Sequence, residues 1–294
     1  MNKIRNNKLA VFLFMTPAAA LFLVIIIAPI VMSGYYSVLE WDGMSKGTFV
    51  GLQNYAELFS SNSIGFQLAL KNAFLLAILS TIVTLPISLL LALVLGNGIK
   101  GARFFVSALF VPSLISSVVI GQLWSKIYNP DYGILNMVLQ NIGLEELTRT
   151  WLGDPDTALI AVYIVMLWQY MGYHMLLLYA GVKTVSPELR EAARIDGASE
   201  WQVAKFVSIP MIKSVIRICV IFSVVGSFKA FDLIYVLTNG GPAHASEVPS
   251  TLMINMIFGR NRYGSGSAIA VFIIFLCFFF AILIKKVFKV EEEE

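Results

Sequence analysis

Long stretches without a charged residue are the feature of this sequence that most limits its possible folds. Five of them exceed the roughly 18 residues that mark a membrane-spanning helix, and they cover residues 9–39, 72–99, 104–125, 157–182 and 263–284. Because 58% of the 294 residues are hydrophobic and only 13% are charged, so much apolar surface cannot be buried in one water-soluble core. The sequence therefore predicts a polytopic membrane protein.

A sixth apolar stretch, from about Ile218 to Leu237, contains Lys229 and Asp232. Charges at such depth cost several kcal/mol unless they are paired or face a cavity, so we expect a helix with a functional interior. None of the stretches shows the alternation that is typical of barrel strands. We therefore predict an all-α fold, a single transmembrane domain over 1–294 with six transmembrane helices at about 9–38, 72–98, 104–126, 157–182, 214–237 and 263–286.

The first stretch begins like a secretory signal peptide, because Lys3, Arg5 and Lys8 precede its apolar residues. Its apolar run is about twice as long as that of a signal peptide, so we interpret it as an uncleaved first helix. Pro17 and Pro29 are expected to bend this helix, since a proline removes a backbone hydrogen bond.

The basic residues are distributed unequally between the two sides of the membrane. With the amino terminus placed in the cytoplasm, 14 of the 21 Lys and Arg residues lie in segments predicted inside, 6 lie outside, and Lys229 lies within the membrane. Cytoplasmic loops carry the excess of Lys and Arg, so we expect both termini and the loop 183–217 to be cytoplasmic. The acidic segment 126–156 is then external, and the acidic tail 291–294 is expected to be a solvated end.

Composition also excludes several classes of site. The two cysteines, Cys219 and Cys277, lie far apart in apolar segments, and two histidines are too few for a metal site. A net charge of +3 is small and dispersed, which does not indicate a nucleic-acid partner. We expect no metal and no cofactor in this chain.

The longest loop predicted to be cytoplasmic, 183–213, has the signals of two short helices. Ser186 can cap a helix that begins at Pro187, with Glu188 in its first turn, where the helix dipole favours an acid. Gly197 is placed to end that helix. A second amphipathic helix is expected from about 199 to 207, and it should stop before Pro210. Such a helix-turn-helix is suited to docking a partner.

The spacing within this loop is recognisable. Glu191-Ala192-Ala193, three residues, Gly197, nine residues, Val207, one residue, Ile209 and Pro210 resembles the EAA loop of permease subunits in binding-protein-dependent ABC importers. Only Val207 and Ile209 depart from the family pattern, where Ile and Leu are usual. The resemblance implies contact with an ATP-hydrolysing partner through Glu191, Ala192, Ala193, Asp196, Gly197 and Pro210.

Further segments resemble carbohydrate permeases of the maltose-transporter type, specifically the first of their two permeases. These segments are 49–55, 129–136, 231–242 and 263–264. The resemblance implies the type I importer fold, a sugar substrate, a second permease, two ATP-binding subunits that hold ATP and Mg, and an external sugar-binding protein. It also implies a bacterial cytoplasmic membrane. The chain lacks the G-x-x-x-x-G-K-[ST] run of a P-loop, so ATP must be hydrolysed by another subunit.

Polar side chains within the spans are candidates for a substrate pathway, because in lipid they must face a cavity or another helix. Gln169, Tyr170, Tyr173 and His174 form a stripe on the fourth helix, and Lys229 and Asp232 are three residues apart and able to pair. Aromatic faces and hydroxyls suit sugar rings, and the family resemblance places sugar contacts on the helices that flank the EAA loop. The predicted pathway residues are Tyr170, Tyr173, Ser223, Ser227, Lys229 and Asp232.

Other interpretations stay open at this point. The serines can simply permit close helix packing, the tyrosines can be packing aromatics, and the Lys229–Asp232 pair can be structural. An ion-coupled secondary transporter would be expected to show discontinuous helices and inverted repeats, and neither is visible in the sequence. A membrane-embedded enzyme would need a nucleophile with a base or a metal cluster, so we expect a transport subunit and not an enzyme.

Overall fold

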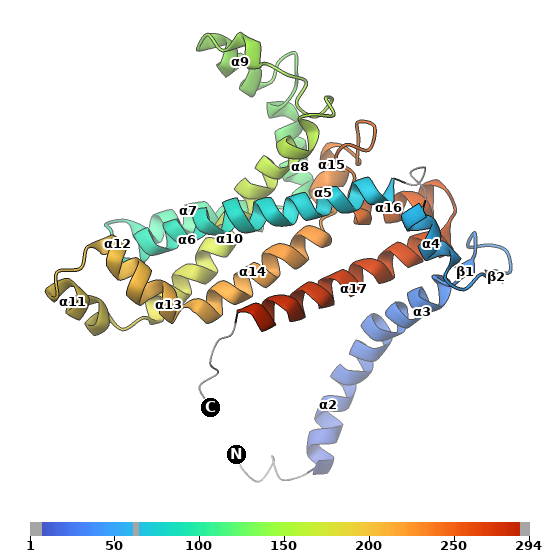
Figure 1. Cartoon of the computed structure of the whole chain (residues 1–294), viewed down its shortest axis with the longest axis horizontal. Helices are drawn as coiled ribbons and strands as arrows, with labels where there is room; N and C mark the ends of the chain where they lie inside the picture. Colours follow the sequence, from blue (N-terminus) through green and yellow to red (C-terminus); the bar gives the residue numbers. More distant parts are fainter. Residues whose placement is uncertain (1–7, 61–64, 289–294) are drawn as a thin grey trace. The chain divides into compact units, whose positions relative to one another are not determined.

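A computed structural model describes residues 8–60 and 65–288 of the chain (Figure 1). The chain forms two compact units, one from Met1–Ile64 with Met253–Ile274 and the other from Gly65–Leu252 with Phe275–Glu294. Five helices are long and apolar enough to cross a membrane, and a sixth span is present if one bent helix pair is counted. The prediction of a helical, polytopic membrane protein is confirmed.

The first unit begins with an apolar span of three consecutive helical segments, followed by a short hairpin and a helix. These elements are α2 (Lys8–Phe22), η1 (Leu23–Ile27, a π-helix), α3 (Ala28–Tyr36), β1 (Leu39–Glu40), β2 (Thr48–Phe49) and α4 (Gln53–Ser60). The two strands pair antiparallel. Asn54 of α4 fixes the end of the span, because its Nδ2 donates to the carbonyl oxygens of Ser37 and Leu39, each at 2.8 Å.

The same unit is completed by the later elements η5 (Asn255–Gly259, a π-helix) and the first part of α17 (Tyr263–Val287). Ser265 of α17 donates to Asn54 Oδ1 at 3.3 Å, and Arg262 pairs with Glu57 at 2.5 Å. These bonds connect residues about 200 positions apart, so sequence periodicity could not predict them.

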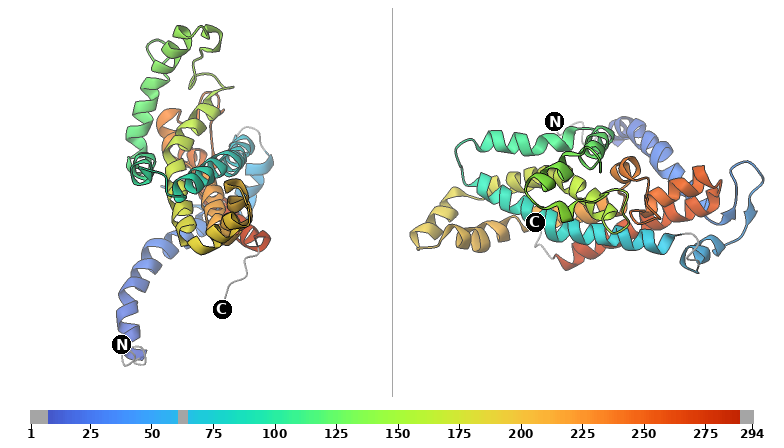
Figure 2. Two further views of the ribbon diagram at one scale, coloured as in Figure 1. Left: turned by 90° about the vertical axis from the view of Figure 1, so that its left-hand side faces the viewer. Right: turned by 90° about the horizontal axis from the view of Figure 1, so that it is seen from above.

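The second unit contains the remaining membrane helices. Their bounds are α5 (Phe66–Leu79), η2 (Ser80–Thr84, a π-helix), α6 (Leu85–Gly96), α10 (Ala158–Thr184), α14 (Lys213–Phe228), α15 (Asp232–Leu237) and α16 (Pro249–Ile254). The two views of Figure 2, with the contacts within the unit, show α6 and α10 side by side. Ser88 Oγ donates to Met171 O at 2.9 Å, and Thr84 Oγ1 lies 3.0 Å from Tyr163 Oη.

The third predicted span differs from expectation. Instead of one helix over 104–126, the chain forms α7 (Ala102–Leu114) and α8 (Ser117–Ile127), which are bent by 96°. Ile115 between them is extended, with ψ of 139°, and Ser116 accepts from Val118 N at 3.3 Å as the cap of α8. The prediction of one continuous helix over 104–126 was therefore wrong.

Beyond α8 the chain forms a small subdomain with its own helices, α9 (Ile134–Asn141) and the 3-10 turn η3 (Glu145–Leu147) (Figure 1). Asn136 holds it together, because its Oδ1 accepts from Trp151 Nε1 at 2.7 Å and its Nδ2 donates to Arg149 O at 3.0 Å. The acidic segment predicted to be external is thus folded.

Three prolines follow π-helical turns, and this explains how the helices accommodate them. Pro29, Pro86 and Pro210 each stand at the start of a new α-helical segment, directly after η1, η2 and a third π turn. A proline lacks the N–H that an α-helix interior requires, and a wider turn before it removes that requirement. Pro17, in contrast, lies inside α2.

Candidate functional site

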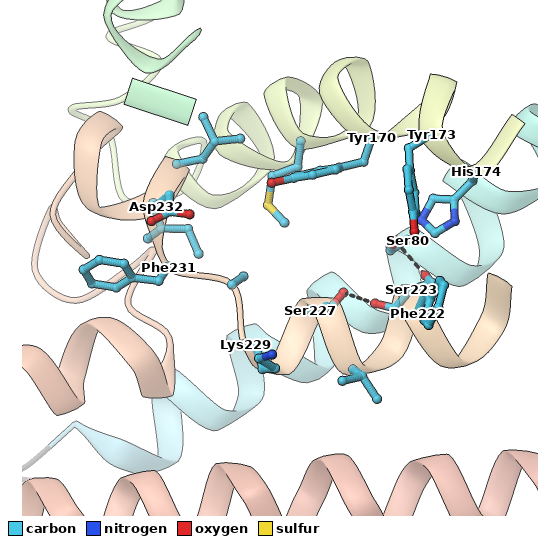
Figure 3. Close-up of a pocket in the computed structure, with 16 residues that line it drawn as sticks. Ser80, Tyr170, Tyr173, His174, Phe222, Ser223, Ser227, Lys229, Phe231 and Asp232 are labelled. Atoms are coloured by element: carbon cyan, nitrogen blue, oxygen red, sulfur yellow. Dashed lines mark hydrogen bonds between the residues drawn. The ribbon is translucent and has the colours of Figure 1, made fainter. Parts of the chain in front are cut away.

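A cavity of about 490 Å³ lies within the second unit (Figure 3). Its walls come from α10, α14, the link 229–231, α15 and the π turn η2. Cavities of roughly 300–1,000 Å³ are typical of small-molecule sites. The structure brings together in this one cavity all the predicted pathway residues, Tyr170, Tyr173, Ser223, Ser227, Lys229 and Asp232.

The α10 wall is largely aromatic. Tyr170 and Tyr173 are 38% and 37% exposed, so their rings are accessible and not packed in the core. His174 lies beside them, edge-on to the Tyr173 ring at 5.5 Å, and is buried, with an Nδ1 that has no hydrogen-bond partner. This wall therefore offers two aromatic faces with a buried imidazole next to them.

The α14 wall carries small polar residues. Ser223 Oγ donates to Ser80 Oγ of η2 at 2.8 Å, and Ser227 Oγ donates to Ser223 O at 2.9 Å. A Cβ added at Gly226, which also lines the cavity, would meet no atom within 4 Å. The serines thus stabilise the wall, whereas Gly226 leaves room for a ligand.

Lys229 and Asp232 do not form the predicted ion pair. The prediction assumed one continuous helix over 214–237, but α14 ends at Phe228 and α15 begins at Asp232. Between them Phe231 has φ −143° and ψ −64°, so the three-residue spacing no longer places the two side chains on one helical face. Their charged groups are not within ion-pair distance of each other, and both line the cavity. Irregular backbone at membrane depth is tolerated where it lines a cavity.

The predicted polar stripe on α10 is divided between two environments. Gln169 does not line the cavity; its Nε2 donates to Ile115 O at 3.3 Å, at the bend between α7 and α8. The amide stabilises a carbonyl that the bend leaves without a helical partner.

The sequence analysis did not predict that Ser80 and Gly226 line the cavity. The signals that could have indicated them were a hydroxyl group in the second span and a glycine in the fifth.

The loop after α10 folds as the sequence predicts in its first half. Helix α11 (Pro187–Ile195) begins after Ser186, and Gly197 ends it with φ +84°. Gly197 N donates to Arg194 O and Ala198 N to Ala193 O, both at 3.0 Å, which is the Schellman pattern. The Ser186 hydroxyl does not cap the helix. It donates instead to the Glu188 carboxylate, and this hydrogen bond lowers the pKa of Glu188.

The second half of the loop is a longer helix than expected. Ser199 and Gln202 form a capping box at the start of α12 (Glu200–Val203), which continues through η4 (Ala204–Ser208, a π-helix) into α13 (Ile209–Met211). The prediction that this helix stops before Pro210 was wrong, because the π turn places Pro210 in the first turn of α13, where no N–H is needed.

Most residues of the EAA pattern lie on an exposed surface, whereas Val207 and Ile209 pack against the core of the second unit. Helix α11 has no buried residue, and its apolar Leu189 and Ile195 are 47% and 85% exposed. Glu191, Ala192, Ala193, Asp196 and Gly197 lie on α11 and its carboxyl end, and Pro210 lies on α13. Large apolar side chains in water are unfavourable as a group, so this loop has the composition of an interface.

Comparison with known proteins identifies the family. Residues 70–289 match the family model described as the binding-protein-dependent transport system inner membrane component. The chain belongs to this family. The family match covers the cavity helices and the EAA loop together, and its members are transport components and not enzymes.

Several curated relatives extend over the whole chain. The probable ABC transporter permease protein YurN of Bacillus subtilis is 38% identical, with 99% of this chain and 100% of the relative covered. The trehalose/maltose transport system permease protein MalF of Thermococcus litoralis is 32% identical, with coverage of 97% and 95%. The diacetylchitobiose uptake system permease protein NgcF of Streptomyces coelicolor is 30% identical, with coverage of 96% and 83%.

Among solved structures, a bacterial ABC transporter involved in the import of the acidic polysaccharide alginate has a chain with the same fold. The TM-score is 0.83 at 23% identity, and 98% of this chain and 97% of that chain are covered. A bacterial alginate ABC transporter in complex with an alginate pentasaccharide-bound periplasmic protein gives a TM-score of 0.84 at 21% identity, with 97% of this chain and 96% of that chain covered. The predicted importer permease fold is thereby confirmed.

Proposed function

We propose that the chain is a permease subunit of an ATP-driven importer that translocates a sugar or oligosaccharide delivered by an extracellular binding protein. The observation that carries this proposal is the cavity between α10 and α14, which has two accessible tyrosine rings opposite small hydroxyl side chains. Sugar rings stack their C–H faces on aromatic rings and need partners for their hydroxyls. Relatives named for trehalose, maltose and diacetylchitobiose support the same substrate class.

The proposed assembly adds a second permease, two ATP-binding subunits that hold ATP and Mg, and the binding protein. This chain contains no P-loop, and its unburied helix α11 offers a docking surface for an ATP-binding subunit. Glu191 would pair with a basic group there, so we expect Glu191→Lys to release the ATP-binding subunits while the permease still reaches the membrane. A pull-down of those subunits tests this.

We also propose a bacterial cytoplasmic membrane location with both termini and the EAA loop in the cytoplasm, on the basis of the 14 to 6 distribution of basic residues. Ser199→Cys should resist an impermeant thiol reagent added to intact cells. Strong labelling of that cysteine from outside would overturn the orientation.

The decisive experiment for the function is reconstitution of the complex in proteoliposomes with its binding protein and a panel of sugars. Uptake should require ATP and the binding protein, and it should persist when ion gradients are collapsed by ionophores. Uptake that continues without ATP and stops with the ionophore would instead support the ion-coupled alternative.

A further inference from the structure

The two halves of the EAA loop are joined by an ion pair with two hydrogen bonds. Arg194, in the last turn of α11, donates from Nε to Glu200 Oε1 at 2.7 Å and from Nη2 to Glu200 Oε2 at 3.0 Å. Glu200 is the first residue of α12, on the other side of the turn at Gly197. A planar guanidinium held by both oxygens of a carboxylate restricts orientation as well as distance.

Glu200 has a second partner outside the loop. Asn97 Nδ2 donates to Glu200 Oε2 at 3.3 Å, and Asn97 directly follows α6. The neighbouring Gly96 O accepts from Lys183 Nζ at 3.0 Å. The end of α6 is therefore bonded to the loop at two points, Lys183 at the start of the loop and Glu200 near its centre. Glu200 is therefore the point where α11, α12 and α6 meet.

Helix α6 continues directly into the cavity wall. It follows η2 without interruption, and Ser80 of η2 lines the cavity and accepts the hydrogen bond of Ser223. A displacement of α11 that is transmitted through Glu200 to α6 would thus reach the residues around the substrate. Energetic coupling between distant sites travels through such chains of hydrogen bonds and rigid helices.

The ion pair does little for the stability of the fold. The Arg194 and Glu200 side chains are 39% and 59% exposed, and ion pairs at this exposure add little to unfolding free energy. The hydrogen bond nevertheless lowers the pKa of Glu200 and raises that of Arg194, so both groups are charged at neutral pH. This interaction has strict geometry but contributes little to stability, so it is suited to positioning one helix relative to another.

We propose that Glu200 is a positioning residue whose bonds to Arg194 and Asn97 make α11 move together with the end of α6. The proposal rests on the proposed function and extends it, because it names the connection by which ATP hydrolysis would reach the cavity wall. Without this connection α11 would still bind its partner but would move independently of α6.

The test compares Arg194→Glu, Glu200→Arg and the double variant that exchanges the two charges, in proteoliposomes of the full complex. We expect each single variant to raise the ATP hydrolysed per sugar imported by about 2- to 30-fold, the range for residues within a coupling network. The exchanged pair should recover most of the wild-type ratio, because it restores the ion pair and the guanidinium at position 200 can donate to Asn97 Oδ1 once that amide is rotated. Lys100→Glu is the matched control, because it reverses an exposed charge close to Asn97 that forms none of the ion pairs found in the described residues.

The proposal is overturned if both single variants keep the wild-type ratio, if the exchange recovers nothing, or if Lys100→Glu has as large an effect. Hydrogen exchange of the amides in 193–203 gives a second measurement that needs no transport. Exchange should rise in each single variant and fall again in the exchanged pair; unchanged exchange in all three overturns the proposal. If the wild-type complex shows no ATP-driven uptake, the proposed function fails, and the exchange measurement still decides whether Glu200 positions α11.

Discussion

The EAA loop and the cavity are both parts of the second unit, but different kinds of interaction organise them. The loop is built by bonds between residues three to six positions apart, such as the Schellman pattern at Gly197 and the capping box at Ser199. The cavity is built by bonds between distant residues, such as Ser80 with Ser223, which are 143 positions apart. Local signals therefore shape the surface that would contact a partner, and tertiary contacts shape the surface that would contact a ligand.

Two glycines show this difference directly. A Cβ at Gly172 of α10 would collide with the backbone of Leu109 and Phe110 of α7, so this glycine is required by packing. A Cβ at Gly197 would meet no atom within 4 Å, but φ is +84°, so this glycine is required by its own backbone conformation.

The largest effect is expected from Gly172→Ala. The new methyl would force α7 away from α10 at the centre of the bundle, and overpacking of this kind costs about 1–3 kcal/mol or more. Thermal unfolding and the yield of the assembled complex measure the loss. Gly226→Ala is the matched control in the same unit, because its methyl would enter open space and should stabilise α14 by about 0.5–1 kcal/mol. Equal unfolding temperatures for the two variants would contradict this account of packing.

The next effect concerns transport and not stability. Gly226→Trp should nearly abolish sugar uptake, because the indole would enter the cavity between α14 and the tyrosines of α10. The unfolding temperature and the retention of the ATP-binding subunits should stay close to those of Gly226→Ala. Normal uptake by a correctly folded Gly226→Trp complex would show that the sugar does not pass through this cavity.

A smaller effect is expected from Gly197→Val. Placing a β-branched residue at positive φ costs roughly 1–2 kcal/mol, so the Ala198 amide should exchange faster and the ATP-binding subunits should be retained less well. Gly197→Asn should be milder, because Asn is the other residue that occurs at this position. If the Gly197→Val and Gly197→Asn variants show the same exchange and retain the ATP-binding subunits equally, the positive φ at Gly197 is not what determines the structure of the loop.

The smallest effect is a pH dependence of the loop. Arg194 lowers the pKa of Glu200 in the folded loop, so the stabilisation is complete above the ordinary Glu pKa of about 4.3. This stabilisation is lost as the pH falls below the ordinary Glu pKa and then through the lowered pKa that Glu200 has in the folded loop. The protection factors of the 193–203 amides, which correct for the intrinsic pH dependence of exchange, should therefore decrease between pH 5 and pH 3 in the wild type, and the decrease should be smaller in Glu200→Gln. An identical pH profile in both proteins would contradict the role assigned to the carboxylate.

The sequence predicted the parts of the fold whose signals lie within a few residues. The apolar runs predicted the membrane helices, since crossing hydrocarbon requires about 20 apolar residues in a row. The start of α11 at Pro187 and its end at Gly197 followed from helix-terminus rules. The candidate lining residues followed from the cost of polar groups in lipid, and the structure brings all six of them to one cavity.

Tertiary contacts, more than local signals, decided where the spans are interrupted. The bend between α7 and α8 is stabilised by Gln169, which lies 54 residues after Ile115, although Pro112 and the N-cap residue Ser116 also mark the break locally. The break after Phe228 likewise separated Lys229 from Asp232, which a continuous helix would have paired. A free carbonyl or an unpaired charge is tolerated at membrane depth only if a partner helix or a cavity accommodates it. Those partners are brought together by folding, and for this reason the sequence specified the helices while the packed bundle determined where they break.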